Sequence, residues 1–318
     1  MKSRRLLQCS FVVCSFCAVS RMVYAFGVPP VPKKKHEPPK TNGHCPQPRK
    51  VQKGDTEPLL PATPGAISRN EKVGIDLVEI RAGWFKMGSP NGTGDDDEHP
   101  QHMVYLDRYR IAKTEVTVAQ FRRYCESSGY SYDWNGMKPS WGYVDDYPMV
   151  NVTWDEALAY CKWAGGDLPT EAEWEKAAKG TDGRVYPWTG DWDADKCVDW
   201  SNSDGRHAPV GSKPKGASPY GVLDMAGNVF EWCKDFYDGT YYRHSPKRNP
   251  LNSNNAVHRV LRSHPFSHGF RCADRIRIIP DKWNFGTIGF RPVFTGDKAV
   301  IGGRKQTDKP SSITKSGK

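Results

Sequence analysis

The stretch Pro148–Glu175, PMVNVTWDEALAYCKWAGGDLPTEAEWE, carries two helix starts of the same design. In each, a threonine is followed three residues later by a glutamate: Thr153 by Glu156, and Thr170 by Glu173. In this reciprocal capping pattern, each side chain accepts a hydrogen bond from the other residue's backbone N–H. The apolar residues that follow recur at helical spacing. The stretch therefore predicts two short helices, one after each threonine.

A third helix start and several β-like runs surround this stretch. Thr117 and Gln120 repeat the capping pattern ahead of another apolar stripe. Runs such as Leu77–Ile80, Trp84–Met87 and Met103–Leu106 have strand composition, and Gly, Pro, Asn and Asp fill the loops between them. The sequence predicts an α+β domain with little regular secondary structure. Such loops usually need extra support from a metal ion or from disulfides.

Aromatic residues mark out one domain in the 318-residue chain. All 11 tryptophans and 13 of the 14 tyrosines lie within residues 75–294, which we expect to form a single unit. Residues 26–74 hold ten of the 25 prolines and nine Lys or Arg, a composition that buries too little apolar surface to fold. We expect this segment to be an extended, disordered linker, and residues 295–318 to be a disordered basic tail.

The first 25 residues resemble a secretory signal peptide in their composition. A basic start precedes the apolar run Leu6–Ser20, and small residues near Ala25 suit signal cleavage. The run is too short to span a bilayer comfortably. We expect a mature N-terminus near Phe26 and an exported protein that is periplasmic, at the cell surface or extracellular. An uncleaved anchor is the alternative.

The excess positive charge of the chain, a formal net charge of +10, lies in its two ends. Residues 75–295 hold 27 Lys or Arg against 30 Asp or Glu, whereas the remainder holds 19 against 6. A basic tail without interleaved aromatic residues is a weak nucleic-acid signal, so we expect no nucleic-acid partner. For an exported protein, such ends favour a solvated linker or electrostatic association with an anionic envelope.

Short motifs follow one another in a fixed order over residues 75–294. They are Gly83–Gly88 (GWFKMG), the quoted stretch, Tyr186–Trp188 (YPW), Pro219–Trp232 (PYGVLDMAGNVFEW), Arg271–Ala273 (RCA) and Gly289–Arg291 (GFR). Together they resemble the formylglycine-generating enzyme family, also called the sulfatase-modifying-factor domain. The resemblance implies a single-domain variant of the C-type-lectin-like fold, which agrees with the loop-rich pattern.

The chain lacks the redox cysteines that the resemblance implies. Active family members oxidise a sulfatase cysteine to formylglycine with oxygen and Cu(I), which two cysteines hold in a loop before the Arg-Cys-Ala segment. Here that loop is about six residues shorter, and Ser263–Phe270 contains no cysteine. We therefore expect no copper, assign no catalytic residue, and leave open whether the chain is an enzyme. His264 and His268, four apart in the same loop, are the candidates for a rebuilt metal site.

Calcium is the cofactor that the resemblance favours, because carboxylates and carbonyls in a loop suit this ion. The residues that match the family's second calcium site are Asp224, Gly227, Val229 and Glu231. Asn202 and Ser203 match the start of the first site, whose downstream acidic stretch is shortened here. The alternative is that Asp224 and Glu231 pair with arginines such as Arg275. The acidic run 95–98 is expected to be a solvated loop.

Six cysteines follow the signal segment, and their pairing is not determined by the sequence. In the family, the disulfide partners of Cys161 and Cys272 stand where this chain has Pro292 and Ala178. We therefore expect either new disulfides or buried free thiols.

Three classes of function remain in view. The first is a non-catalytic, calcium-stabilised binding or scaffold module whose aromatic loops, such as 130–134 and 235–242, contact an unknown protein or glycan. The second is an oxidoreductase of the formylglycine-generating type with a rebuilt metal site. The third is a structural envelope component that its basic linker tethers.

Overall fold

The computed structural model describes residues 59–136, 138–139, 141–199, 202–265, 270–281 and 286–296. The expected signal segment, most of the linker and nearly all of the basic tail lie outside the described residues, as does His268. No helix in the described part is long and apolar enough to cross a membrane.

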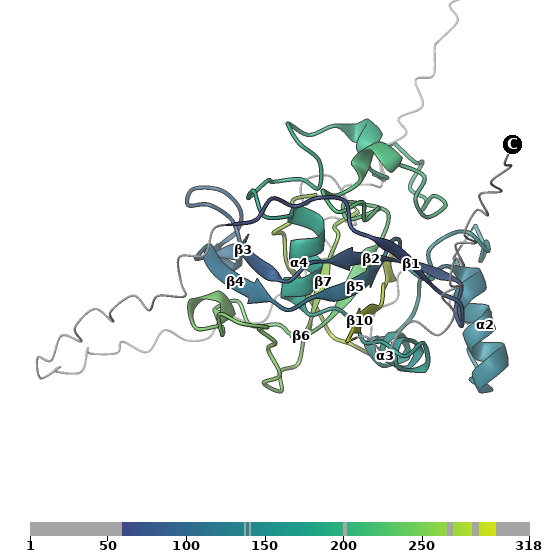
Figure 1. Cartoon of the computed structure of the whole chain (residues 1–318). Coiled ribbons are helices and arrows are strands. Elements are labelled where there is room, and N and C mark those ends of the chain that lie inside the picture. The colour runs from purple at the N-terminus through teal and green to yellow at the C-terminus, as the bar shows by residue number, and fades with distance from the viewer. Residues whose placement is uncertain are drawn as a thin grey trace, which may run out of the picture. The chain divides into compact units, whose positions relative to one another are not determined.

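Strands from the two ends of the domain form one antiparallel sheet (Figure 1). In spatial order its strands are β1 (Ile67–Asn70), β2 (Ile75–Ile80), β5 (Tyr109–Ala112) and β10 (Val293–Thr295). Val78 of β2 pairs with both Ile67 and Ile111, and Val293 pairs with Ile111 on its other side. The sheet therefore closes the domain by joining its first and last strands.

Two further sheets complete the β-structure. The hairpin of β3 (Gly83–Met87) and β4 (His102–Leu106) forms a two-stranded sheet. The third sheet has the order β8 (Ile276–Ile278), β7 (Arg259–Arg262), β6 (Phe230–Phe236) and β9 (Ile288–Gly289). β6 is antiparallel to β7 and parallel to β9. The short strands agree with the loop-rich pattern of the sequence.

The three predicted helices form, and all three capping boxes are present. They are α2 (Val118–Ser128), α3 (Trp154–Trp163) and α4 (Glu171–Lys179). Each starts directly after its capping threonine, whose side chain accepts from the backbone N–H three residues on. Single-turn 3₁₀ helices η1 (Asp96–Glu98), η2 (Ala194–Lys196), η3 (Pro214–Gly216) and η4 (Tyr241–Arg243) lie in the loops.

The chain joins the sheet before residue 75, which is the predicted start of the domain. β1 pairs with β2 over Ile67–Asn70, and Val73 is buried in the core. The end of the segment expected to be a disordered linker is thus part of the domain. Composition alone missed it because a four-residue strand adds little apolar character to a Pro- and Lys-rich segment.

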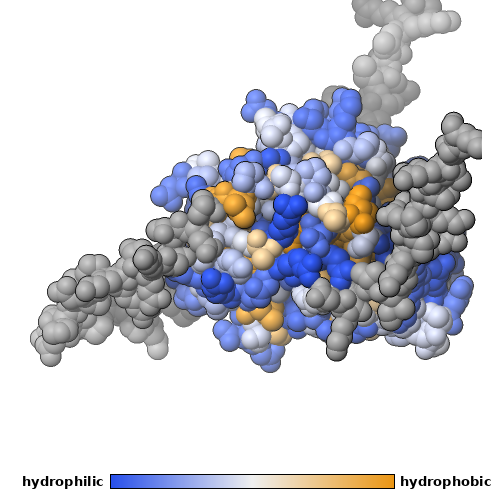
Figure 2. Space-filling model, in the orientation of Figure 1, coloured by the Kyte–Doolittle hydropathy of each residue, from blue (hydrophilic) through white to orange (hydrophobic). Residues whose placement is uncertain are grey.

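The core is built around α4 and the aromatic residues of α2 and α3. α4 contacts β3, β4, β6 and β7, so it lies against two sheets. Phe121 of α2 stacks on Tyr160 of α3, and both rings contact Phe290 edge-on. On the face shown in Figure 2, hydrophilic residues predominate and apolar residues form small patches. The apolar residues are therefore mostly used in packing.

Loss of one helix cap should lower stability by a predictable amount. Thr153→Ala removes the Oγ that accepts from the Glu156 N–H and begins α3. We expect the free energy of unfolding to fall by about 1 kcal/mol in urea denaturation. The control Thr93→Ala removes an exposed hydroxyl that donates to the Pro90 carbonyl and should change stability by less than about 0.5 kcal/mol. Equal stability of the two variants would contradict the role of this cap.

Candidate functional site

The loop from Asp224 to Glu231 leads into β6 and has an unusual backbone. Asp224, Gly227 and Asn228 all have positive φ, at 58°, 86° and 61°. A Cβ on Gly227 would lie 2.2 Å from the Val198 carbonyl oxygen, so only glycine fits there. This conformation brings the carbonyls of Asp224 and Gly227 to the Ser263 hydroxyl, which donates to them at 3.3 and 2.9 Å. Two carbonyls of the loop thus converge on one hydroxyl, and that of Gly227 is one of the predicted calcium ligands.

Glu231, at the end of this loop, is fully buried and paired with Arg291. The guanidinium donates to both carboxylate oxygens, from Nε to Oε2 at 2.6 Å and from Nη2 to Oε1 at 2.7 Å. Oε2 also accepts from the Trp174 indole at 3.0 Å. The arginine partner is therefore Arg291, whereas Arg275 pairs with Glu171. Oε2 has no capacity left for a metal ion, and Oε1 retains one lone pair.

Two further carboxyls lie beside this pair without an arginine of their own. The Asp224 Oδ2 accepts from the Gly211 N–H at 2.5 Å, and the Glu115 Oε1 accepts from the Asn228 amide at 3.1 Å. The buried Glu115 Oε2 has no hydrogen-bond partner in the described structure. Burial raises the pKa of both carboxyls, and for Glu115 the neighbouring Asp224 adds to the rise. Both shifts favour the protonated, neutral form of these carboxyls, and a side-chain hydrogen bond with Glu115 acts in the opposite direction on the pKa of Asp224.

This donor set fits a calcium ion, with one change from the sequence-based assignment. Asp224, the Gly227 carbonyl and Glu115 Oε2, which has no donor within hydrogen-bond distance among the described residues, would hold the ion, and its binding would release the protons that the raised pKa values favour. Glu231 would contribute at most through Oε1. Val229 lies on the same loop with its side chain buried. Sequence reasoning missed Glu115, whose only signal is an acid next to the apolar Val116.

The residues expected to begin the first calcium site are used within their own turn. Asn202 accepts from the Asp199 N–H at 3.0 Å and donates to the Ala194 carbonyl at 2.8 Å. Ser203 donates to the carbonyls of Asp199 and Arg206. Their side chains close a local turn.

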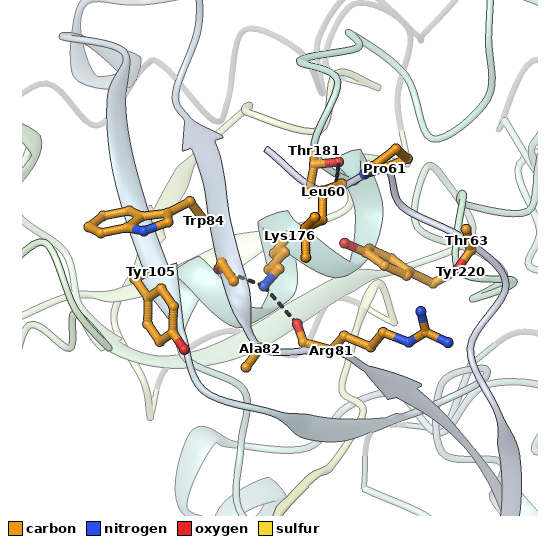
Figure 3. Close-up of a pocket in the computed structure, with 11 residues that line it drawn as sticks. Leu60, Pro61, Thr63, Arg81, Ala82, Trp84, Tyr105, Lys176, Thr181 and Tyr220 are labelled. Atoms are coloured by element: carbon orange, nitrogen blue, oxygen red, sulfur yellow. Dashed lines mark hydrogen bonds between the residues drawn. The ribbon is translucent and has the colours of Figure 1, made fainter. Parts of the chain in front are cut away.

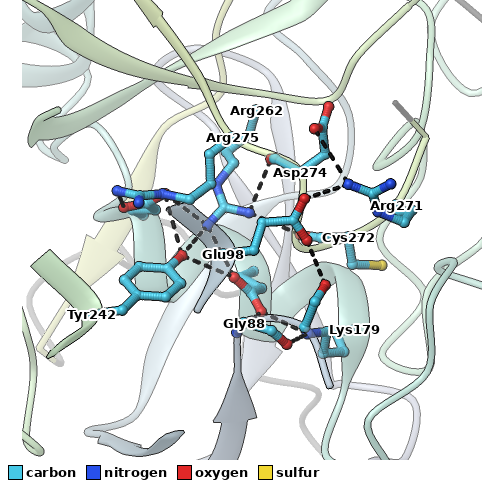
Figure 4. A network of polar contacts seen from close by, with 12 residues as sticks. Gly88, Glu98, Lys179, Tyr242, Arg262, Arg271, Cys272, Asp274 and Arg275 are labelled. Atoms are coloured by element: carbon cyan, nitrogen blue, oxygen red, sulfur yellow. Dashed lines mark hydrogen bonds and ion pairs between the residues drawn. The ribbon is translucent and has the colours of Figure 1, made fainter. Parts of the chain in front are cut away.

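The acidic run at 95–98 is more ordered than the expected solvated loop. Glu98 is fully buried and accepts from Ser89 and Arg271. Oxygens of Asp95, Glu98 and Asp274 lie within 4.8 Å of one another, a spacing that would suit the ligands of one metal ion. Arg271 ion-pairs with all three, so the cluster already has a cation. Figure 4 shows Arg271 beside Glu98 and Asp274.

A larger buried network joins α4 to β7 in the same region (Figure 4). Arg262 donates to Glu171 at 2.8 Å and to Glu175 at 2.9 Å, and Lys179 donates to Glu175 at 2.7 Å. Burial alone would raise the pKa of Glu175, but Lys179 and Arg262 outweigh it and lower the pKa to about 2. These charges are paired and hydrogen-bonded, which is the arrangement that makes their burial tolerable.

Asp235 caps the N-terminus of α4 from within this network. Its oxygens accept from the backbone N–H of Glu171 at 2.8 Å and of Asn252 at 2.9 Å. Burial, together with the negative charge of Glu171, raises its pKa to about 7. Asp235 is therefore a buried carboxyl that titrates near neutrality.

Of the candidate metal-binding histidines, the structure describes only His264. The His264 ring packs edge-on against Phe230, with centroids 4.9 Å apart, and His268 lies outside the described residues. The described cysteines, which are all free thiols, are Cys125, Cys161, Cys197, Cys233 and Cys272. Burial raises the pKa of every one of these thiols, to about 12 for Cys197 and Cys272. None is therefore a thiolate at neutral pH.

A family model described as "Sulfatase-modifying factor enzyme 1-like domain" matches residues 63–295. The chain belongs to this family. As a sulfatase-modifying-factor domain it has the fold class that the sequence predicted, a single α+β domain with few helices and short strands.

Curated relatives of this sulfatase-modifying-factor domain include formylglycine-generating enzymes and protein kinases. The formylglycine-generating enzyme of Streptomyces coelicolor is 31% identical, over 74% of this chain and 93% of that protein. The serine/threonine-protein kinase pkn1 of Chlamydia caviae is 37% identical, over 68% of this chain but only 37% of the kinase. The chain thus spans little more than a third of the kinase's length.

Solved structures share the fold at low sequence identity. PvdO from Pseudomonas aeruginosa superposes with a TM-score of 0.64 at 24% identity, over 73% of this chain and 98% of that one. Treponema denticola variable protein 1 gives 0.57 at 23% identity, over 72% and 98%. These similarities establish the fold alone.

Calcium should stabilise the protein through Asp224 and Glu115. A ligand that binds only the folded state raises the melting temperature by mass action. We expect chelation of the calcium-loaded protein to lower the melting temperature, and Asp224→Asn or Glu115→Gln to remove this effect. Asp204→Asn, on an exposed turn, is the matched control and should retain it. A chelator-insensitive melting temperature in a protein shown to be calcium-loaded would eliminate the site.

Asp235 should make stability fall as pH rises. Its folded pKa of about 7 lies above the ordinary value of about 3.9, so its contribution is complete below pH 4 and is lost as pH rises through 7. Relative to Asp235→Asn, we expect the wild type to lose on the order of 1–3 kcal/mol between pH 5 and pH 8 in urea denaturation. Parallel pH profiles would show that Asp235 does not titrate in this range.

Proposed function

We propose that this chain is an exported, non-catalytic binding or scaffold module of the sulfatase-modifying-factor family, stabilised by calcium. The observation that carries the proposal is that the loop before Arg271 contains no cysteine. Cu(I) chemistry in this family requires a pair of thiolates, and the cysteines that the structure describes are buried or half-buried free thiols.

The expected aromatic contact loops need revision, because most of their rings face the core. Tyr241 and Tyr242 are buried, and Tyr132 packs against Phe121 with centroids 5.3 Å apart. A better contact surface surrounds Trp192, which is 38% exposed and stacks on Phe270 at 4.2 Å. Exposed, rigidly held aromatic rings suit contacts with a glycan or a protein.

The distribution of charge supports a location at an anionic envelope. It does not favour a nucleic-acid partner. The excess positive charge lies outside residues 75–295, in segments suited to association with an anionic surface. The chlamydial kinase contains a segment similar to this chain within a longer protein. This agrees with a domain that serves as a module.

The alternative is an oxidoreductase of the formylglycine-generating type. It is favoured by the 31% identity to the Streptomyces coelicolor enzyme over nearly all of that protein. Such an activity would require a metal site other than a thiolate pair, for which His264 and His268 are the candidates.

The two functions predict different products when the protein is incubated with a sulfatase-motif peptide. With Cu(I), oxygen, a thiol reductant and a sulfatase-motif peptide, we expect no formylglycine product by mass spectrometry, because the loop before Arg271 has no cysteine to bind Cu(I). The Streptomyces coelicolor enzyme, assayed in parallel, is the positive control. Turnover that is lost in His264→Ala or His268→Ala would overturn the proposal and support the rebuilt-site enzyme.

A further inference from the structure

A pocket of about 160 Å³ lies where the first described residues pass over α4 and the β3–β4 hairpin (Figure 3). Leu60, Pro61 and Thr63 form one wall, and Trp84 and Tyr105 form another. The volume is close to that of a protein cavity that holds one benzene ring. The pocket is separate from the calcium ligands and from the loop that bears His264.

Lys176 reaches this pocket from α4 and is almost completely buried, with 1% of its surface exposed. Its Nζ donates to the carbonyls of Arg81 at 2.9 Å and Gly83 at 2.8 Å. No carboxylate pairs with it in the described structure, and burial lowers its pKa to about 8. Lys179, one turn further along α4, is by contrast paired with Glu175. A buried ammonium without a counter-charge is unfavourable unless something else supplies one.

The rest of the lining offers donors and positive charge. Arg81 is a second cation, and no acidic residue lines the pocket. The buried indole N–H of Trp84 has no hydrogen-bond acceptor among the described residues. The carbonyls of Arg81 and Gly83 already accept from Lys176. The third N–H of Lys176 and the Trp84 indole N–H thus have no acceptor among the described residues, and an anion would supply one.

The aromatic wall is held in place from outside the pocket. The rings of Trp84 and Tyr105 meet edge-to-face with centroids 5.4 Å apart. The Arg248 guanidinium lies 4.1 Å from the Tyr105 ring centroid and 5.5 Å from that of Trp84. A rigid apolar wall beside a cation suits a ligand with one charged end and one flat or apolar body.

We propose that this pocket binds a small organic carboxylate about the size of one ring, with its carboxylate on Lys176 and its body against Trp84 and Tyr105. The third N–H of Lys176 is available to the carboxylate, because only two of the three are used. This site does not depend on the function proposed above.

The test compares three carboxylates with their neutral amides on the full chain. Benzoate, cyclohexanecarboxylate and acetate are titrated beside benzamide, cyclohexanecarboxamide and acetamide, with binding followed by calorimetry or NMR. We expect one of the two cyclic acids to bind at least tenfold tighter than its amide and than acetate. Equal binding of acid and amide, or no binding by either cyclic acid, would overturn the proposal.

Variants place the binding at Lys176. Lys176→Met should weaken the cyclic acid at least tenfold, while Lys162→Met, at an exposed lysine on α3, should leave it unchanged. Unchanged affinity in Lys176→Met would overturn the proposal.

Two further measurements hold even if Lys176→Met fails to fold. Trp84→Phe removes the unpartnered N–H and should weaken the acid more than its amide. In the wild-type protein, affinity should fall as pH rises from 7 to 9, because Lys176 gives up its proton there. The other titratable groups that line the pocket are Arg81, Tyr105 and Tyr220. A pH-independent affinity, or an equal loss for acid and amide in Trp84→Phe, would overturn the assignment.

Discussion

The buried ion pair between Glu231 and Arg291 joins the two four-stranded sheets. Glu231 lies on β6, whereas Arg291 lies between β9 and β10 and also donates to the Ala112 carbonyl of β5. Trp174 of α4 donates to the same carboxylate, so the pair is also a contact for the central helix. Removing one partner of such a pair typically costs about 3–5 kcal/mol, because it leaves an uncompensated buried charge.

Charge placement also separates structural from functional sites in this domain. The Glu98 and Glu175 carboxylates form ion pairs with arginine or lysine side chains. We therefore interpret these networks as structural. Two places lack this balance in the described structure. Near Glu115 and Asp224, burial raises the pKa of two carboxyls, and the Lys176 ammonium has carbonyl partners but no carboxylate among the described residues. Because unbalanced buried charge is costly, these two places are where an ion or ligand has most to contribute.

The candidate site was only partly accessible from the sequence. The motif around Asp224 located the loop, since its glycine is required by a positive φ and by contact with the Val198 carbonyl. The motif did not show that Arg291 holds Glu231, because these residues are 60 positions apart. Glu115 was missed for the same reason, since its neighbour Asp224 is more than 100 residues away. Contacts of this kind depend on the sheet arrangement, which local patterns do not specify.

The sequence by itself determined the helices, the fold family and the absence of a cysteine from the redox loop. These follow from local chemistry: a capping threonine needs only the glutamate or glutamine three residues on, and a missing thiol is visible in the residue order. The tertiary structure alone decided the place of β1, the partners of the buried charges and the burial of Lys176 against carbonyls without a carboxylate. Burial and charge pairing are collective properties, because they depend on which distant segments exclude water from the same volume.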